Sequence, residues 1–259
     1  MKSNTLFFSP TQTGATVCQA IQSGLTLTSG ESIDLPRVTE PKTFGADDVV
    51  IISMPVYSGR LPTLAVEQFK KIQGGGALAV VVVMYGNRAF DDALLELSDL
   101  CTEQGFSVIA SAAFIGVHSF SMPKFPIAVG RPDASDLQKA AEFGALVQKK
   151  MDSGEELTPP SVPGNRPYKD AMNPMGAIAE SDSENCIQCG LCETFCPSHA
   201  ITLTKEGPQT DAEKCIGCTA CVKACTSHAR KITMPKIYEI AERLHNACQT
   251  RQEPEWFLK

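Results

Sequence analysis

Short apolar runs alternate with stretches of helical periodicity over residues 1–151. The runs 47–53 and 77–84 are continuous and rich in β-branched side chains, which is typical of strands covered on both faces of a parallel sheet. Three further strands are expected at 4–8, 31–35 and 106–114. Helical spacing of the apolar positions predicts helices at 14–24, 62–72, 88–104 and 133–151.

Strand and helix therefore alternate at the spacing of βαβ units, which predicts an α/β fold with a doubly wound, parallel, five-stranded sheet. The helix after the second strand is expected to be short or absent, because Pro36 and Pro41 interrupt that region. Ligands of such sheets bind beyond the carboxyl ends of the strands. The loops that follow the strands are therefore the candidate site.

The loop after the first strand is dense in hydroxyl groups and leads directly into a helix. Backbone N–H groups, the helix dipole and hydroxyl donors together form a phosphate-binding loop, whereas the alternative is a helix N-cap with a solvated turn. No lysine follows Gly14, which excludes a nucleoside triphosphate P-loop. The candidate phosphate-binding residues are Ser9, Thr11, Gln12, Thr13, Gly14, Ala15 and Thr16.

Two further loops, 54–60 and 84–91, follow the third and fourth strands. Their aromatic residues are candidates to stack on a flat ring, and their glycines can bring backbone groups to its polar edge. The candidate ring-binding residues are Pro55, Val56, Tyr57, Ser58, Gly59, Tyr85, Gly86, Asn87, Arg88, Phe90 and Asp91. A fourth loop carries His118, which could move protons near that ring or be purely structural.

The spacing C-x2-C-x2-C-x3-C occurs twice, at 186–196 and 215–225, and uses eight of the eleven cysteines. This is the spacing that holds 4Fe–4S clusters in bacterial-type ferredoxins. Zinc sites normally use pairs of cysteines with a longer insert. A disulfide framework needs an oxidising compartment, and no secretory signal precedes these runs. The remaining three cysteines, Cys18, Cys101 and Cys248, are expected to be small apolar core residues.

Residues 6–21 resemble the flavodoxin signature, with Thr11, Gly14, Thr16, Ala20 and Ile21 in register. Ser9 departs from it, because that position commonly holds an aromatic residue. The cysteine runs resemble a bacterial-type ferredoxin, with one departure at Thr226, where the first run has Pro197. The chain as a whole resembles flavodoxin–ferredoxin fusion proteins of anaerobic bacteria and archaea. The likeness covers residues 1–150 and 182–236.

This resemblance implies one FMN and two 4Fe–4S clusters. In two-cluster ferredoxins the fourth cysteine of each run serves the other cluster. The implied ligands of one cluster are Cys186, Cys189, Cys192 and Cys225, and those of the other are Cys215, Cys218, Cys221 and Cys196. His199 and His228 occupy equivalent places in the two runs and could either donate hydrogen bonds to cluster sulfur or only cap the local turns.

Four segments are expected: a flavodoxin-like domain at 1–151, a Pro/Gly-rich linker at 152–181, a small α+β ferredoxin domain at 182–236, and a helix with a tail at 237–259. The linker contains Pro159, Pro160, Pro163, Pro167 and Pro174. We expect it to lie over the first domain and to hold the cluster domain against the flavin, because electron transfer falls steeply with distance.

Composition limits the remaining choices. With 259 residues, 43% of them apolar, the chain can bury a core, and its net charge of −6 with no basic cluster argues against nucleic acid. No apolar stretch reaches the length of a membrane span. Free cysteines and oxygen-sensitive clusters predict an anaerobic source and a cytoplasmic location.

The function expected from these features is electron transfer between the clusters, FMN and a redox partner protein. The alternative is an FMN-dependent reductase of a small-molecule acceptor that the clusters supply with electrons. The sequence names neither donor nor acceptor, and a homodimer remains open.

Overall fold

The computed structural model describes residues 1–171 and 176–259, so Pro174 of the linker lies outside the described residues. Five parallel strands run in the order β2-β1-β4-β6-β7, which is the flavodoxin-like order 2-1-3-4-5. Their bounds are β1 Lys2–Phe7, β2 Thr28–Asp34, β4 Asp48–Pro55, β6 Leu78–Tyr85 and β7 Ser107–Ile115. The predicted α/β fold class is therefore confirmed.

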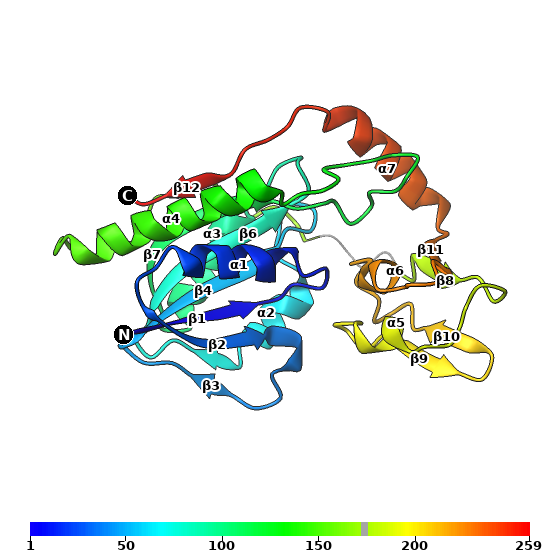
Figure 1. Ribbon diagram of the computed structural model, residues 1–259, viewed down its shortest axis with the longest axis horizontal. Coiled ribbons are helices and arrows are strands. Elements are labelled where there is room, and N and C mark those ends of the chain that lie inside the picture. Colours follow the sequence, from blue (N-terminus) through cyan, green and yellow to red (C-terminus); the bar gives the residue numbers. More distant parts are fainter. Residues whose placement is uncertain (172–175) are drawn as a thin grey trace.

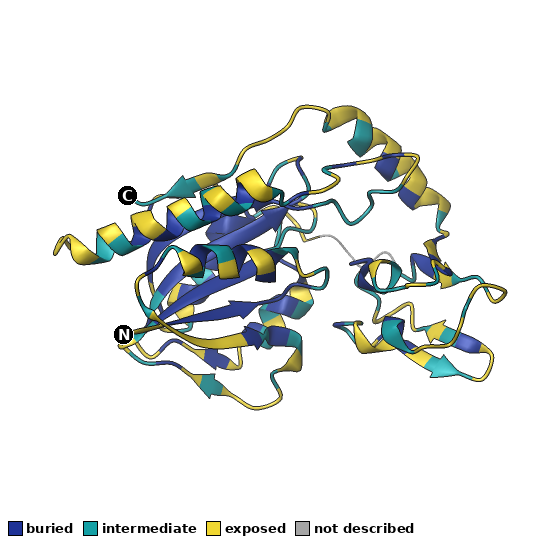
Figure 2. Cartoon of the chain, in the orientation of Figure 1, coloured by how far each residue is buried: buried dark blue, intermediate teal, exposed yellow. Residues whose placement is uncertain are grey.

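Helices cover both faces of this sheet (Figure 1). One face packs against α1 (Thr13–Ser23) and α4 (Ala134–Asp152), and the other packs against α2 (Thr63–Phe69) and α3 (Ala93–Glu103). Helices α1 and α4 cross very closely, because a side chain at Gly24 or Gly144 would meet the backbone of the opposite helix at 2.0 Å. Figure 2 shows that the central strands are buried along their length, as their β-branched runs predict.

The segment after β2 has no full helix. It forms one 3-10 turn, η1 (Leu35–Arg37), with Pro36 in the first turn, where a proline is tolerated. The chain then forms a minor sheet from β3 (Lys42–Thr43) and β5 (Ile72–Gln73).

The C-terminal unit is small and built from two related halves. It contains strands β8 (Ala179–Ser181) and β11 (Arg230–Ile232), which pair, and the hairpin of β9 (Ile201–Thr204) and β10 (Gly207–Thr210). Each cysteine run carries one short helix, α5 (Leu191–Thr194) or α6 (Ala220–Lys223). This unit lies beside the carboxyl ends of the main sheet (Figure 1).

The last segment returns to the first domain. Helix α7 (Pro235–Ala247) packs Ile237 against Ile178, Ala179 and Ile232 of the cluster unit. The chain then forms β12 (Glu255–Phe257), which adds antiparallel to β7 as a sixth strand that the sequence did not predict. Trp256 stacks on Phe143 of α4, with ring centroids 6.0 Å apart. The C-terminal segment therefore contacts both units: α7 packs on the cluster unit, and β12 joins the main sheet.

The described part of the linker lies against α3. Asp92 accepts hydrogen bonds from the backbone N–H groups of Asn165 and Lys169, at 2.9 and 2.7 Å. Arg166 forms an ion pair with Asp99. Among the described residues, no helix is long and apolar enough to cross a membrane.

Candidate cofactor sites

A cavity of about 340 Å³ lies beyond the carboxyl ends of the central strands. This volume falls in the range of small-molecule sites. Its wall includes the loops after β1, β4, β6 and β7. The cavity therefore lies where the strand order reverses between β1 and β4, which is the place where flavodoxin-like sheets bind FMN.

The hydroxyl-rich loop contributes Ser9, Thr11, Thr13 and Gly14 to the cavity wall. Ser9 is buried, and its hydroxyl accepts hydrogen bonds from the backbone N–H groups of Gly14 and Ala15 at 3.0 and 3.3 Å. Ser9 therefore caps the start of α1 from five residues upstream. The hydroxyls of Thr11 and Thr13 lie 3.5 Å apart on the same wall.

A half-buried histidine closes another side of the cavity. The Nδ1 atom of His118 accepts a hydrogen bond from the backbone N–H of Phe120 at 3.0 Å, so its proton is on Nε2. Burial lowers the pKa of His118 to about 4, and the charges of Lys223 and Arg88 act in the same direction. A neutral His118 can donate a hydrogen bond through Nε2 at neutral pH.

The loops 54–60 and 84–91 are only partly in the wall. Eight of the residues predicted in these loops line the cavity: Pro55, Val56, Tyr57, Ser58, Gly59, Tyr85, Gly86 and Arg88. Arg88 is paired with Asp91. Tyr85 packs edge-on against Phe90. Burial raises the pKa of Tyr85 to about 12, with Glu255 acting in the same direction and Arg131 opposing it.

Six predicted residues do not line the cavity: Gln12, Ala15, Thr16, Asn87, Phe90 and Asp91. Thr16 is one turn into α1, where its hydroxyl donates to the carbonyl of Gln12. Asn87 has a different task, because its side chain donates to the carbonyls of Cys248 and Thr250 and accepts from the N–H of Gln252. The side chain of Asn87 therefore holds the C-terminal segment.

The eight cysteines of the two runs fall into two groups. Each group of four surrounds a small cavity and combines three cysteines of one run with the fourth of the other. The first cavity is lined by Cys186, Cys189, Cys192 and Cys225, and the second by Cys215, Cys218, Cys221 and Cys196. Among the described residues, no three His, Cys, Asp or Glu side chains are arranged to hold a single metal ion.

The two runs have matching backbones. Gln188 and Gly217 have positive φ angles of 52° and 67°, and so do the equivalent histidines His199 and His228, at 50° and 54°. Both histidines are exposed and lie at tight turns, where each backbone N–H donates to the carbonyl of the preceding fourth cysteine. The local backbone around the two cysteine groups is therefore the same.

The second cysteine group lies next to the cavity of the first domain. Ile216 and Gly217, between Cys215 and Cys218, are part of that cavity's wall. Thr219 also donates a hydrogen bond to the carbonyl of Ser119 at 3.0 Å. The two sites therefore share one wall.

Tyr57 lines the main cavity close to the second cysteine group. Burial raises the pKa of Tyr57 well above its ordinary value, the Cys218 thiol raises it further, and a hydrogen bond with Ser119 opposes the rise.

The first cysteine group faces away from this wall. Ile187, the equivalent of Ile216 in the repeat, is 67% exposed, and Cys189 is also exposed. Ile216, in contrast, packs against the apolar core of the first domain. One cysteine group therefore lies at the domain contact and the other lies at the surface.

Several residues of the cavity wall were not predicted. They come from the linker, from α7 and from the second cysteine run: Lys169, Ile216, Gly217, Ile240, Arg243 and Leu244. Arg88, Lys169 and Arg243 are cations, and no Asp or Glu lines the cavity within the described parts of the chain. The helical periodicity of α7 was a usable signal for a buried face, but it does not tell which domain that face contacts.

These donor sets fit the groups that the sequence implied. Two groups of four thiols suit two 4Fe–4S clusters, whose irons each need one cysteine sulfur. The main cavity offers hydroxyls at a helix N-terminus, an aromatic face and a cationic rim, which suit a phosphate-bearing flavin.

Comparisons with known proteins agree with the C-terminal unit. Residues 185–235 match the 4Fe-4S dicluster domain family, and this match assigns two 4Fe–4S clusters to the unit. No curated protein matches the chain.

Solved structures similar to this chain include three flavodoxins. One from the domain Archaea is 15% identical over 58% of this chain and 98% of its own, with a TM-score of 0.41. The flavodoxin of Megasphaera elsdenii, in its two-electron reduced form, is 16% identical over 56% and 98%, with a TM-score of 0.37.

A variant flavodoxin of Fusobacterium nucleatum, bound to flavin mononucleotide, is 14% identical over 58% of this chain and 96% of its own, with a TM-score of 0.39. The strand order of the first domain and the dicluster match of the second make this chain consistent with a flavodoxin–ferredoxin fusion, as its sequence predicts.

Proposed function

We propose that this protein transfers electrons between its two 4Fe–4S clusters and one FMN, and onward to a redox partner. When bound, the clusters would exchange single electrons and the flavin would take up one or two. The observation that carries the proposal is the shared wall: Ile216 and Gly217 belong both to the second cysteine run and to the main cavity. Proximity of this kind is what electron transfer between bound groups requires.

The arrangement supports a definite order of the three groups. The first cysteine group is at the surface, and the second adjoins the main cavity through Ile216 and Gly217. We therefore assign the surface group to exchange with the partner protein and the inner group to exchange with the flavin. The net charge of −6 favours a partner with a basic docking surface and a salt-dependent rate of association.

For FMN, the proposed phosphate ligands are the hydroxyls of Thr11 and Thr13 with the N-terminus of α1. Tyr57 is proposed to face the ring. His118, neutral and protonated on Nε2, would donate a hydrogen bond to a ring acceptor. The cations Arg88, Lys169 and Arg243 would favour the negatively charged reduced flavin.

The first test is cofactor analysis after anaerobic purification. Two clusters and one flavin require about eight irons and one FMN for each chain, with EPR signals of reduced clusters after dithionite treatment. Eight irons without flavin, even after reconstitution, would contradict the flavin part of the proposal.

The crossed ligand sets have their own test. Cys225→Ser should disturb the cluster held by Cys186, Cys189 and Cys192, although it lies in the other run. The matched control is Cys248→Ser, because Cys248 lies outside both cavities. If Cys225→Ser instead disturbs the cluster held by Cys215, Cys218 and Cys221, or leaves an EPR signal equal to that of the control, the crossed arrangement is wrong.

A second function, reduction of a small molecule at the flavin, is favoured by one observation. Besides the flavin loops, the cavity has a wall of Ile240, Arg243 and Leu244 from α7. Such a wall suits an anionic acceptor with an apolar body. Saturable turnover whose KM rises in Arg243→Gln, with kcat unchanged, would support this activity, whereas exchange with protein carriers alone would exclude it.

A further inference from the structure

A buried arginine lies between the two cysteine groups. Arg230, the first residue of β11, is only 3% exposed. It lines both small cavities, the one surrounded by the first cysteine group and the one surrounded by the second.

In the described parts of the chain, no Asp or Glu forms an ion pair with Arg230. Its guanidinium donates hydrogen bonds to the hydroxyls of Ser181, at 3.2 Å, and Thr210. Both partners are neutral. A buried cation is unfavourable unless negative charge is near. The nearby candidates for that charge are the cysteine sulfurs, since the backbone N–H of Arg230 also donates to Cys225 Sγ at 3.3 Å.

One donor of this side chain has no acceptor. The Nε atom of Arg230 is buried and makes no hydrogen bond within the described parts of the chain. Buried donors are almost always paired, so an unpaired one beside two thiol-lined cavities indicates an acceptor that the polypeptide does not supply. The sulfur atoms of a cluster are acceptors of this kind.

The repeat shows that this cation is not a general feature of the run. The position equivalent to Arg230 in the first run is Ile201, which is also buried. An apolar residue can therefore occupy this place in the fold, and the arginine breaks the symmetry of the two halves.

We propose that Arg230 is a shared cation that raises the reduction potentials of both 4Fe–4S clusters. Each cluster becomes more negative by one charge on reduction, and a buried cation with a free N–H stabilises that charge more than it stabilises the oxidised cluster. Because both cavities include Arg230, its effect reaches both clusters. The inference rests on the proposed function, since it requires that the clusters are bound.

The test is an EPR-monitored redox titration of the full-length protein with both clusters present. In Arg230→Gln and Arg230→Ile, the potentials of both clusters should shift to more negative values, whereas Arg230→Lys should keep them near those of the wild type. The matched control is Lys231→Gln, which removes an adjacent charge whose side chain is 61% exposed and screened by water. Potentials in Arg230→Gln that equal those of the control would overturn the proposal.

A second variant keeps the test decisive if the neutral substitutions prevent cluster assembly. In Arg230→His the charge is present only when the imidazole is protonated, so both potentials should rise as the pH falls through the titration of that histidine. Potentials independent of pH, with clusters intact, would overturn the proposal. A wild-type protein that contains far fewer than about eight irons would instead contradict the proposed function itself. That outcome is distinct from a failure of the role proposed for Arg230.

Discussion

At the level of single residues, the chemistry of the main cavity was easier to predict than the role of each side chain. The density of hydroxyls in 9–16 correctly indicated a polar loop beside the cavity, but it did not show that the Ser9 hydroxyl bonds to the backbone of α1. Asn87 is similar: its position after β6 was apparent, whereas its partners lie more than 160 residues away and leave no local signal.

Ser9→Ala should lower the free energy of unfolding by about 1 kcal/mol, because two N–H groups of α1 lose their acceptor. The control is Thr16→Ala, which removes an exposed hydroxyl and should change stability by less than about 0.5 kcal/mol. Chemical denaturation of both variants measures the difference. Equal losses would show that the Ser9 hydroxyl does not cap the helix.

His118 should make stability depend on pH. Its pKa is lowered to about 4 in the folded protein, so the folded state resists protonation and the unfolded state takes up the proton first. This contribution is complete above the unfolded pKa of about 6.5 and is lost as the pH falls from there toward 4. Between pH 7 and pH 5 it amounts to a loss of about 2 kcal/mol.

The measurement is the midpoint of chemical unfolding at several pH values, compared with His118→Gln. The variant retains an acceptor for the N–H of Phe120 but cannot take up the proton. Its stability should therefore fall less than that of the wild type over this range. Parallel pH profiles for the two proteins would contradict the assignment.

At the level of elements, the five parallel strands were predictable because each has a strong local pattern. Strand β12 has no such pattern and was therefore not predictable. The pairing of β12 with β7 is antiparallel and joins segments that are far apart in sequence. Hydrophobic periodicity gives the type of an element but not its partner.

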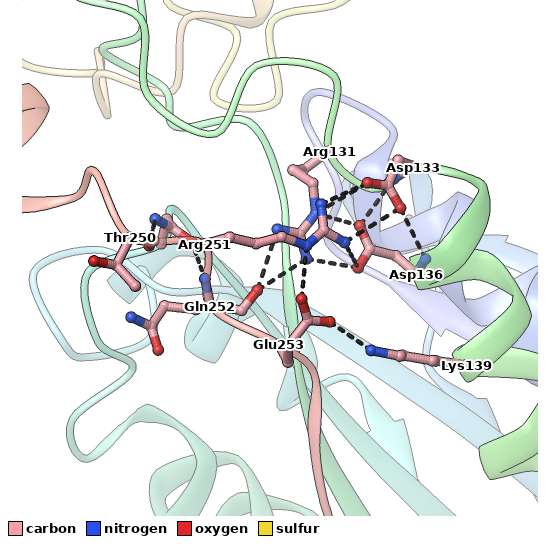
Figure 3. A network of polar contacts seen from close by, with 9 residues as sticks. Arg131, Asp133, Asp136, Lys139, Thr250, Arg251, Gln252 and Glu253 are labelled. Atoms are coloured by element: carbon pink, nitrogen blue, oxygen red, sulfur yellow. Dashed lines mark hydrogen bonds and ion pairs between the residues drawn. The ribbon is translucent and has the colours of Figure 1, made fainter.

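Charged residues fix the segment before β12 to the start of α4 (Figure 3). Arg131 forms a buried ion pair with Asp136 and donates to the carbonyl of Gln252. Arg251 of the tail pairs with Asp133, the N-cap of α4, and Glu253 pairs with Lys139. The network thus joins the tail to the helix that covers one face of the sheet.

Removing one member of the buried pair should be costly. Arg131→Met leaves the fully buried carboxylate of Asp136 without its main counter-charge, and the free energy of unfolding should fall by about 3–5 kcal/mol. Arg251→Met removes a cation whose side chain is 43% exposed, and its cost should be much smaller, because water screens the charge. Thermal or chemical unfolding distinguishes them, and similar losses would show that burial of the pair is unimportant.

At the level of the whole molecule, the two units were predictable, whereas the cysteine run that faces the main cavity was not. The cysteine spacing indicated the cluster unit, and the strand pattern indicated the sheet. The contact depends on which repeat faces the cavity, and the two runs carry the same isoleucine at equivalent positions, Ile187 and Ile216. Only the fold distinguishes them, since one is largely exposed and the other packs on the first domain.

This pair of isoleucines provides a direct test of the order of electron transfer. Ile216→Ser removes apolar contact from the wall that the second cysteine group shares with the main cavity. In a stopped-flow experiment with both clusters and FMN bound, it should slow the reduction of the flavin by the clusters within the same chain. This internal rate should not depend on protein concentration.

Ile187→Ser is the matched control, because it makes the same chemical change in the other repeat, at a side chain that contacts solvent. It should leave the internal rate unchanged and alter only the exchange of electrons with a protein partner. If the two variants slow flavin reduction equally, the second cluster is not the one that adjoins the flavin. If Ile187→Ser alone slows it, the order of the two clusters is the reverse of the proposed one.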